Sequence, residues 1–418
     1  MVKLRDSFAL KNSVYHCEGL DLTQLAAQVG TPAYIYSQAA LAANCTEMLS
    51  AFADYPTLPC FAVKAMSNLT LLRQIFNAGF GADLVSGGEL QRSLLAGAQP
   101  DRIVFSGVGK QAEEIDQALA AGILMFNVES PYELDLISTL ARQRGLTAGI
   151  CLRVNPNVDA KTNAKIATGL YSTKFGLPEA ALPQLLERMA TDPQIALIGI
   201  GCHIGSQMVD LDPLRLAAKQ MVQIAGHLQQ LGHKLRYLDM GGGLGIRYDQ
   251  ETPPSFAEYG RTLIDIVRPS GLHLIIEPGR ALVGNTAILL TKVLGVKTTP
   301  ERNFVIVDAA MNDLIRPTLY GSYHEISPVL AATKGTAVLC DFVGPICETG
   351  DFLGKERVMQ LPSAGDLMFL RSCGAYAASM ASQYNSRPRA PEVLVSGSGY
   401  QIVRRRETTA ALWADELI

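Results

Sequence analysis

The sequence lacks several features that mark whole classes of protein. No stretch of its 418 residues approaches the ~20 uninterrupted apolar residues that a membrane span needs. The formal net charge is only -3, which argues against nucleic acid or an anionic membrane as a partner. Residues 1–10 mix Lys3, Arg5 and Asp6 with apolar residues, and we expect no signal peptide there.

Paired cysteines are also missing. The eight cysteines are scattered and include no C-x-x-C pair, which is typical of reduced cytoplasmic thiols rather than a disulfide framework or a zinc site. No second histidine stands at metal-ligand spacing from His203, so we expect no metal site. The chain does have 48% hydrophobic residues, enough for a large core. Its length suits about two or three domains, and we expect a soluble cytoplasmic enzyme.

From residue 35 to about 285, short apolar runs alternate with segments of helical periodicity. Eight such units fit a (β/α)8 barrel of the TIM type. The predicted strands are Cys60–Val63, Ala82–Val85, Ile103–Phe105, Leu124–Val128, Ala148–Val154, Leu197–Cys202, Tyr237–Met240 and His273–Ile276, and helices are expected over 68–76, 88–95, 113–120 and 131–144. A doubly wound open sheet is the competing α/β architecture, but it would not place reactive residues at the end of nearly every strand.

Polar or glycine-rich segments follow most of these predicted strands, where the active site of such a barrel gathers. They are Lys64, Asp83–Ser86, Asn155–Asn157, His203–Ser206, Gly241–Gly243 and Glu277–Arg280.

After about residue 285 the pattern changes to strand-like runs separated by proline and glycine turns. The predicted strands are Ala287–Val296, Phe304–Val307, Ala337–Val343, Asp366–Leu370, Glu392–Val395 and Tyr400–Arg404. We expect a second, all-β domain that is antiparallel and barrel-like. The predicted domains are therefore residues 35–285 for the barrel, and residues 1–34 with 286–418 for the β domain.

Lys64 ends the first apolar run of the predicted barrel. Partial burial lowers the pKa of a lysine, and a neutral amine can form a Schiff base with a carbonyl compound. Taken alone, this stretch is more typical of a solvated lysine at a strand end. The other strand ends favour the reactive amine.

Three consecutive glycines, Gly241 to Gly243, follow the seventh predicted strand. They are not part of a dinucleotide fingerprint, since Ile246 stands where the last glycine should fall. Their backbone N–H groups suit a phosphate, and the alternative is a tight turn without a ligand. Glu277 and Arg280 form either a surface ion pair or part of a pyridoxal phosphate site, in which the carboxylate holds a proton on the ring nitrogen.

Two further residues leave alternatives open. His203 is either structural or stacks on a flat cofactor, and Cys347 is either an inert buried thiol or a reactive one beside Glu348.

Together these residues resemble the diaminopimelate decarboxylase family of alanine-racemase-like, fold type III pyridoxal phosphate enzymes. The likeness covers nearly the whole chain. The matching segments include Phe-Ala-Val-Lys-Ala (61–65), Ser-Gly-Gly-Glu-Leu (86–90), Lys-Phe-Gly (174–176), Cys-His-Ile-Gly-Ser-Gln (202–207), Gly-Gly-Gly-Leu-Gly (241–245), Glu-Pro-Gly-Arg (277–280), Asp-Leu-Ile-Arg-Pro (313–317), Gly-Pro-Ile-Cys-Glu (344–348), Gly-Ala-Tyr (374–376) and Tyr-Asn-Ser-Arg-Pro (384–388).

The resemblance implies roles for individual residues. Lys64 would form a Schiff base with pyridoxal 5'-phosphate, His203 would stack on its ring, and Cys347 would protonate the substrate carbon. The implied cofactor-binding residues are Lys64, His203, Ser206, Gly241, Gly242, Gly243, Glu277, Gly279, Arg280 and Tyr376, and the implied substrate-binding residues are Arg280, Arg316, Tyr320, Glu348 and Tyr376. Cys347 and Glu348 would reach the site from the second subunit of a homodimer.

The implied reaction is decarboxylation of meso-2,6-diaminopimelate to L-lysine and carbon dioxide, the last step of lysine biosynthesis. One alternative keeps the cofactor and changes the substrate to another basic amino acid or carboxynorspermidine. Another is a catalytically silent relative, against which the joint presence of Lys64, Glu277 and Cys347 argues.

Overall fold

The structure is a computed structural model that describes residues 7–160, 162–331 and 336–417. The described chain divides into two compact units. A barrel unit holds residues 45–246 and 252–281, and a β unit holds the rest. In the described residues, no helix has the length and apolar character to cross a membrane.

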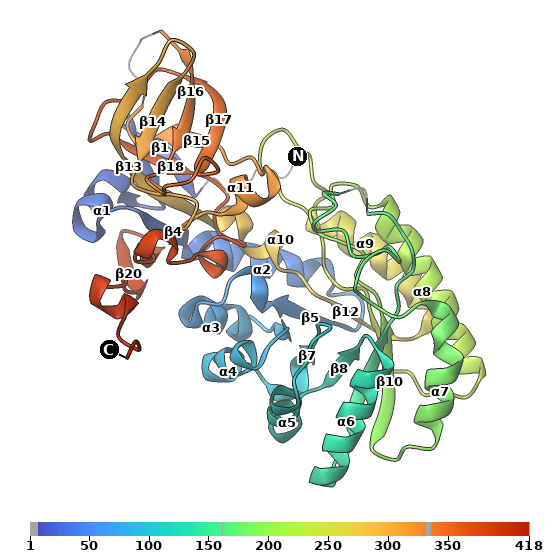
Figure 1. Ribbon diagram of the computed structural model, residues 1–418. Helices are drawn as coiled ribbons and strands as arrows, with labels where there is room; N and C mark the ends of the chain where they lie inside the picture. The colour runs from blue at the N-terminus through green and yellow to red at the C-terminus, as the bar shows by residue number, and fades with distance from the viewer. Residues whose placement is uncertain (1–6, 161, 332–335, 418) are drawn as a thin grey trace. The chain divides into compact units, whose positions relative to one another are not determined.

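The barrel unit is built on a closed barrel of eight parallel strands (Figure 1). Around the barrel the order is β10-β11-β12-β5-β6-β7-β8-β9. The bounds are β5 Thr57–Ala62, β6 Gly81–Leu84, β7 Ile103–Phe105, β8 Met125–Val128, β9 Ala148–Arg153, β10 Ile195–Gly201, β11 Tyr237–Asp239 and β12 His273–Ile276. Each predicted strand overlaps one of these, so the predicted (β/α)8 barrel is confirmed.

Helices lie around the outside of the barrel (Figure 1). They are α3 Leu69–Asn77, α4 Gly87–Ala96, α5 Ala112–Ala121, α6 Pro131–Arg144, α7 Leu182–Ala190, α8 Asp212–Gln230 and α9 Phe256–Val267, and α2 Gln38–Ala51 precedes them. Several begin at a side chain that caps the free backbone N–H groups of the first turn, as Asn68, Ser86 and Ser255 do.

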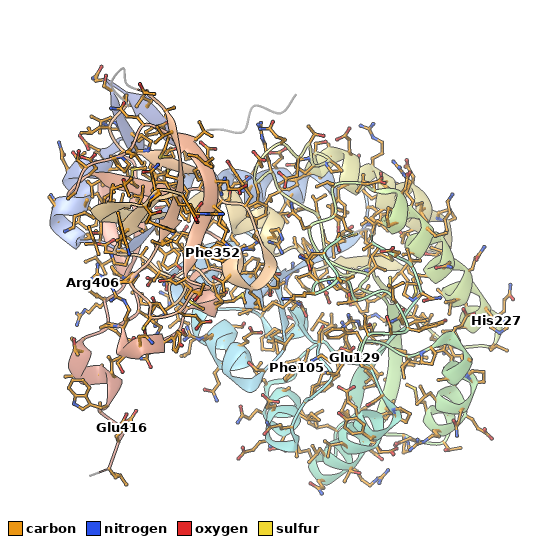
Figure 2. All side chains as sticks on the ribbon, turned by 45° about the horizontal axis from the view of Figure 1, so that its top comes forward. Phe105, Glu129, His227, Phe352, Arg406 and Glu416 are labelled. Carbon is orange, nitrogen blue, oxygen red and sulfur yellow. The ribbon has the colours of Figure 1, made fainter. Side chains whose placement is uncertain are left out.

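Side chains from strands far apart in the sequence fill the barrel interior. One buried cluster joins Cys60, Val104, Met125, Cys151, Tyr237 and Ile275, which come from six different strands. Full burial of one large aliphatic side chain contributes roughly 1.5–3 kcal/mol. Phe105 and Glu129 also lie inside the barrel unit, whereas His227 is exposed on α8 (Figure 2).

The β unit is mostly sheet. A small sheet joins β1 Phe8–Lys11, β2 Val14–Cys17 and β3 Leu20–Asp21. A nine-stranded sheet contains β4 Ala33–Ser37, β13 Ala287–Thr298, β14 Asn303–Val307, β15 Ile326–Pro328, β16 Val338–Val343, β17 Phe352–Met359, β18 Leu367–Leu370, β19 Glu392–Ser396 and β20 Gly399–Arg404. The helices are α1 Leu22–Val29, α10 Arg280–Val283 and α11 Arg316–Tyr320. Along the chain, the boundary between the two units falls within α2 and again within α10.

The predicted all-β domain is confirmed, with differences in detail. All six predicted strands are present, but the expectation of a purely antiparallel sheet is wrong, since β14 pairs with β16 and β4 pairs with β19 in parallel. The pairing of β4 with β13 and β19 also places residues 33–37 in this sheet.

Candidate active site

Lys64 lies at the carboxyl end of the barrel, on the 3-10 turn Val63–Ala65 that follows β5. Its Nζ atom is 2.9 Å from Oδ2 of Asp83, which is completely buried at the end of β6, and the lysine side chain is 35% exposed. The backbone N–H of Ala62 donates to the carbonyl of Pro278 at 3.0 Å. The amine therefore lies beside the ends of β6 and β12, as expected from the sequence.

Buried carboxyl groups lie near this end, or rim, of the barrel. Asn127 on β8 donates from its amide nitrogen to Oδ2 of Asp239 at 3.1 Å and to Oε1 of Glu277 at 3.3 Å. Burial, followed by the nearby charge of Asp239 and then Asp83, raises the pKa of Glu277 well above its usual range. A hydrogen bond with Asp239 also raises the pKa of Glu277, so Glu277 is the carboxyl group of this pair that retains its proton more strongly.

The glycine loop after β11 adopts a backbone that only glycine accommodates. Gly241 and Gly243 have φ values of +62° and +111°. A Cβ atom on Gly242 would lie 2.0 Å from the carbonyl oxygen of Glu277, and one on Gly243 would lie 2.3 Å from that of Gly205. The loop is therefore a bare backbone surface between the ends of β10 and β12.

His203 follows β10 and faces this loop. Its Nδ1 atom accepts a hydrogen bond from the N–H of Gly242 at 3.1 Å. Burial, with smaller effects from Arg153 and Lys64, lowers the pKa of His203 well below its usual range. The ring is therefore neutral and Nδ1 is an acceptor, so its 3.9 Å separation from Oε2 of Glu277 is not an ion pair.

Arg280 and Ser206 supply hydrogen-bond donors on the same rim. An Nη2 atom of Arg280 lies 3.1 Å from Oγ of Ser206, and the arginine is buried at the start of α10. Gly279, immediately before it, is also buried. A guanidinium and a hydroxyl beside the glycine backbone are groups that suit a phosphate.

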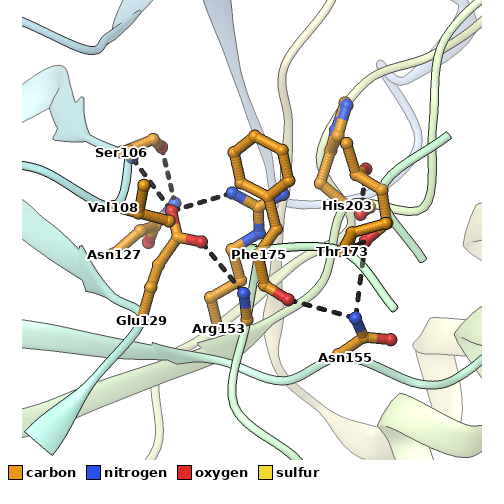
Figure 3. Close-up of polar contacts among 12 residues, drawn as sticks. Ser106, Val108, Asn127, Glu129, Arg153, Asn155, Thr173, Phe175 and His203 are labelled. Carbon is orange, nitrogen blue, oxygen red and sulfur yellow. Dashed lines mark hydrogen bonds and ion pairs between the residues drawn. The ribbon is translucent and has the colours of Figure 1, made fainter. Parts of the chain in front are cut away.

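A buried ion-pair network supports the opposite wall of the barrel (Figure 3). Glu129 accepts from Nη1 of Arg153 at 2.9 Å and from the N–H groups of Gly107 and Gly176, both at 3.0 Å. The Arg153 guanidinium also lies 5.0 Å from the ring centre of Phe175. Arg153 lines a small cavity with Asn127, His203, Asp239 and Glu277, so this network fixes one wall of the space around the carboxyl pair.

The β unit holds the other predicted residues. Arg316 begins α11, is buried, and donates to Oγ of Ser322 at 3.1 Å. Its guanidinium carbon is 4.9 Å from the ring centre of Tyr248 and 6.0 Å from that of Tyr320. The two rings hold the cation in one place by cation–π contacts.

Cys347 and Glu348 lie together in an exposed loop between β16 and β17. The other seven cysteines are buried, so the alternative of an inert buried thiol is wrong for Cys347. Tyr376 has a φ value of +54°, a left-handed conformation that is uncommon for an aromatic residue and marks a constrained segment.

Comparison with known proteins assigns the family. A family model described as "Pyridoxal-dependent decarboxylase, pyridoxal binding domain" matches residues 38–284. Diaminopimelate decarboxylase from Neisseria meningitidis serogroup A is 48% identical over 402 residues, which cover 96% of this chain and 98% of the relative. The enzyme of the same name from Vibrio cholerae is 46% identical over 402 residues, covering 96% of each chain.

A solved structure gives the same result. The crystal structure of diaminopimelate decarboxylase from Helicobacter pylori complexed with L-lysine superposes with a TM-score of 0.91 at 40% identity, covering 94% of this chain and 98% of the other. The chain belongs to the diaminopimelate decarboxylase family. Its barrel is therefore a pyridoxal-binding domain, and the family's cofactor is pyridoxal phosphate.

The residues of the barrel rim fit that cofactor. Lys64 offers an amine for an aldehyde, and the Glu277 carboxyl offers a partner for a ring nitrogen. Beside them, Gly241 to Gly243 carry no side chains, so a phosphate could approach the backbone of this loop closely.

Several residues that contact the predicted groups were missed by the sequence reasoning. They are Asn127, Asp239, Arg153 and Glu129 in the barrel unit, and Tyr248 in the β unit. Asn127 and Arg153 had a usable signal, since each is a polar residue within an otherwise apolar buried strand. Tyr248 had none, because only the fold brings it to Arg316.

Proposed function

We propose that this protein removes one carboxyl group of meso-2,6-diaminopimelate as carbon dioxide and releases L-lysine, the last step of lysine biosynthesis. The main support is identity of 48% along nearly the whole chain to a diaminopimelate decarboxylase. A similar structure from Helicobacter pylori holds L-lysine, the product of this reaction. In the proposed division of labour, the barrel, over residues 35–285, binds the cofactor, and the β domain contributes residues that bind the substrate.

Pyridoxal phosphate, when bound, supplies an electron-withdrawing ring that accepts the electron pair left when carbon dioxide departs. Lys64 binds the aldehyde through its amine, and Asp83, 2.9 Å away, holds that amine in place. Glu277 keeps a proton at the ring nitrogen, which maintains the electron demand of the ring. The neutral ring of His203 would stack on the bound cofactor. Ser206, Gly241, Gly242, Gly243, Gly279, Arg280 and Tyr376 would complete the binding residues.

Charged groups select the substrate. Arg280 and Arg316 bind the distal carboxylate, because guanidinium groups make paired, charge-assisted hydrogen bonds with carboxylates. Tyr320 and Tyr376 contact the same end of the molecule, and Glu348 binds the distal amine. A substrate that lacks the distal carboxylate would leave two arginines without their partner.

Cys347 donates a proton to the carbon from which carbon dioxide departs. In the active protein, a homodimer, Cys347 and Glu348 of one subunit complete the site of the other. The exposure of both side chains in the single chain supports this arrangement. We also propose the cytoplasm as the location, since all eight cysteines are unpaired thiols.

A substrate panel tests the proposal. Carbon dioxide release is measured with meso-diaminopimelate, lysine, ornithine, arginine and carboxynorspermidine at matched concentrations. We expect meso-diaminopimelate to exceed the others by about a hundredfold or more in kcat/KM, because the others leave buried polar groups unpaired. Turnover of ornithine or arginine without turnover of meso-diaminopimelate would overturn it, and a protein that binds the cofactor but turns over nothing would be a silent relative.

Replacing Glu277 by glutamine should lower kcat by roughly tenfold to a hundredfold. The amide cannot hold a proton at the ring nitrogen as a carboxyl does, and hydrogen bonds to charged groups contribute about 1.5–3 kcal/mol. The measurement is kcat at saturating substrate, with cofactor occupancy checked by absorbance. Glu258→Gln, at the exposed start of α9, is the matched control, and an unaltered rate in Glu277→Gln would count against the ring-nitrogen role.

A further inference from the structure

Hydrogen bonds hold the two ends of the loop that carries Cys347 and Glu348. Asp351 is buried, and its two carboxylate oxygens accept from the N–H groups of Met311 and Ile346, each at 2.7 Å. The hydroxyl of Thr318 donates to the carbonyl of Gly350 at 2.6 Å. These contacts hold both ends of the loop. They do not involve Cys347 or Glu348, which lie at its exposed tip.

The segment after Tyr376 provides that support. Oδ1 of Asn385 accepts a hydrogen bond from the backbone N–H of Cys347 at 2.8 Å. Hydrogen bonding with Glu348, followed by the charge of that carboxylate, raises the pKa of the neighbouring Tyr384. Asn385 therefore holds the backbone of the loop tip, and the adjacent Tyr384 interacts with the next residue of the loop, Glu348.

The supporting segment is itself anchored and conformationally constrained. The N–H of Ser382 donates to the carbonyl of Asn312 at 2.8 Å, which ties the segment to the stretch before Arg316. Asn385 and Ser386 have φ values of +55° and +54°. Asparagine tolerates this left-handed conformation better than most residues, so position 385 joins an allowed backbone to a side-chain acceptor.

We propose that Tyr384 and Asn385 are positioning residues for the proton donor and for the amine-binding carboxylate. Asn385 holds the backbone of Cys347, and Tyr384 orients Glu348. The inference rests on the proposed function, in which Cys347 protonates the substrate carbon and Glu348 binds the distal amine. Neither Tyr384 nor Asn385 reacts with the substrate.

The proton-transfer step shows why the position of the thiol matters. Departure of carbon dioxide leaves an electron pair on the substrate carbon. That pair forms a new C–H bond as the S–H bond of Cys347 breaks, and the resulting thiolate regains a proton from water. A thiol held on one side of the carbon delivers the proton to one face only, whereas water can deliver it to either face.

Kinetics should separate the two roles. Asn385→Gly keeps the backbone conformation and removes the acceptor, so we expect kcat to fall about tenfold while KM stays within about twofold. Asn385→Asp keeps an acceptor oxygen and should recover kcat to within about threefold of the parent.

Tyr384→Phe should raise KM about fivefold or more and leave kcat within about twofold. Equal effects on kcat and KM in both variants would overturn the assigned roles.

Matched controls test whether the substitutions act through these contacts. Asn12→Gly removes another exposed asparagine with a left-handed backbone, at φ +49° in the turn between β1 and β2. Tyr400→Phe removes another exposed tyrosine hydroxyl, on β20. Both should retain the parent's kcat and KM.

Two readouts beyond the rate detect a displaced thiol. Lysine formed in heavy water should carry one deuterium on Cε in a single configuration with the parent, and in a mixture of configurations with Asn385→Gly. Alkylation of Cys347 by iodoacetamide, followed by mass spectrometry of its peptide, should be faster in Asn385→Gly because the loop tip is no longer tethered. A single configuration and an unchanged alkylation rate would overturn the inference.

The result also distinguishes this inference from the proposed function. A parent protein that forms no lysine from meso-diaminopimelate contradicts the proposed function itself. A parent that forms lysine normally, with Asn385→Gly and Tyr384→Phe behaving like their controls, contradicts only the positioning roles.

Discussion

Lys64→Ala is expected to abolish the near-visible absorbance of the bound cofactor and to lower kcat by at least about a thousandfold. The variant has no amine to bond to the aldehyde, and the buried carboxylate of Asp83 loses the partner that lies 2.9 Å away. The absorbance spectrum is recorded after dialysis against pyridoxal phosphate and then buffer. Carbon dioxide release from meso-diaminopimelate gives the rate.

The control for Lys64→Ala is Lys219→Ala, which removes an exposed lysine on α8 and should retain both spectrum and rate. Circular dichroism of both variants separates a folding defect from a chemical one. A folded Lys64→Ala protein that keeps the parent's spectrum after dialysis would show that another amine holds the cofactor.

Cys347→Ala is expected to lower kcat by about a hundredfold or more while the cofactor spectrum stays unchanged. Proton transfer by a positioned side chain typically contributes 10²- to 10⁴-fold (about two to four orders of magnitude), and alanine has no proton to give. The measurement is kcat with saturating meso-diaminopimelate. KM should change little, because the thiol acts on the reacting carbon rather than on the distal end of the substrate.

A second cysteine provides the comparison for Cys347→Ala. Cys45 is buried on α2, and Cys45→Ala should retain the parent's kcat even where it lowers thermal stability. If Cys347→Ala turns over as fast as Cys45→Ala, the proton reaches the substrate carbon from another group.

Much of the barrel could be predicted because its strands are buried on both faces. Such strands are continuous apolar runs, and the bounds predicted for β7 and β12 match the structure. The edge strand β17 was missed because Lys355, Glu356 and Arg357 interrupt its apolar pattern, as charges commonly do on sheet edges. The short strands β1 to β3 were missed because two to four residues are too few to show a period.

The pairing of strands in the β unit could not be predicted from the sequence. Strand β4 at residues 33–37 pairs in parallel with β19 at residues 392–396, although the intervening sequence contains the whole barrel. Local periodicity predicts that each segment is extended and buried. It carries no information about which partner, or which direction, completes the hydrogen bonds.

The sequence alone determined that the reactive groups lie at the carboxyl ends of the barrel strands. Lys64, His203, Gly241 and Glu277 each follow an apolar run, and these runs form strands of one barrel. Only the tertiary structure decided their partners: Asp83 for Lys64, Asn127 and Asp239 for Glu277, and Asn385 for Cys347. Strand type follows from the spacing of neighbouring residues along the chain. A hydrogen bond between side chains depends on strand register and loop conformation, which long-range packing sets.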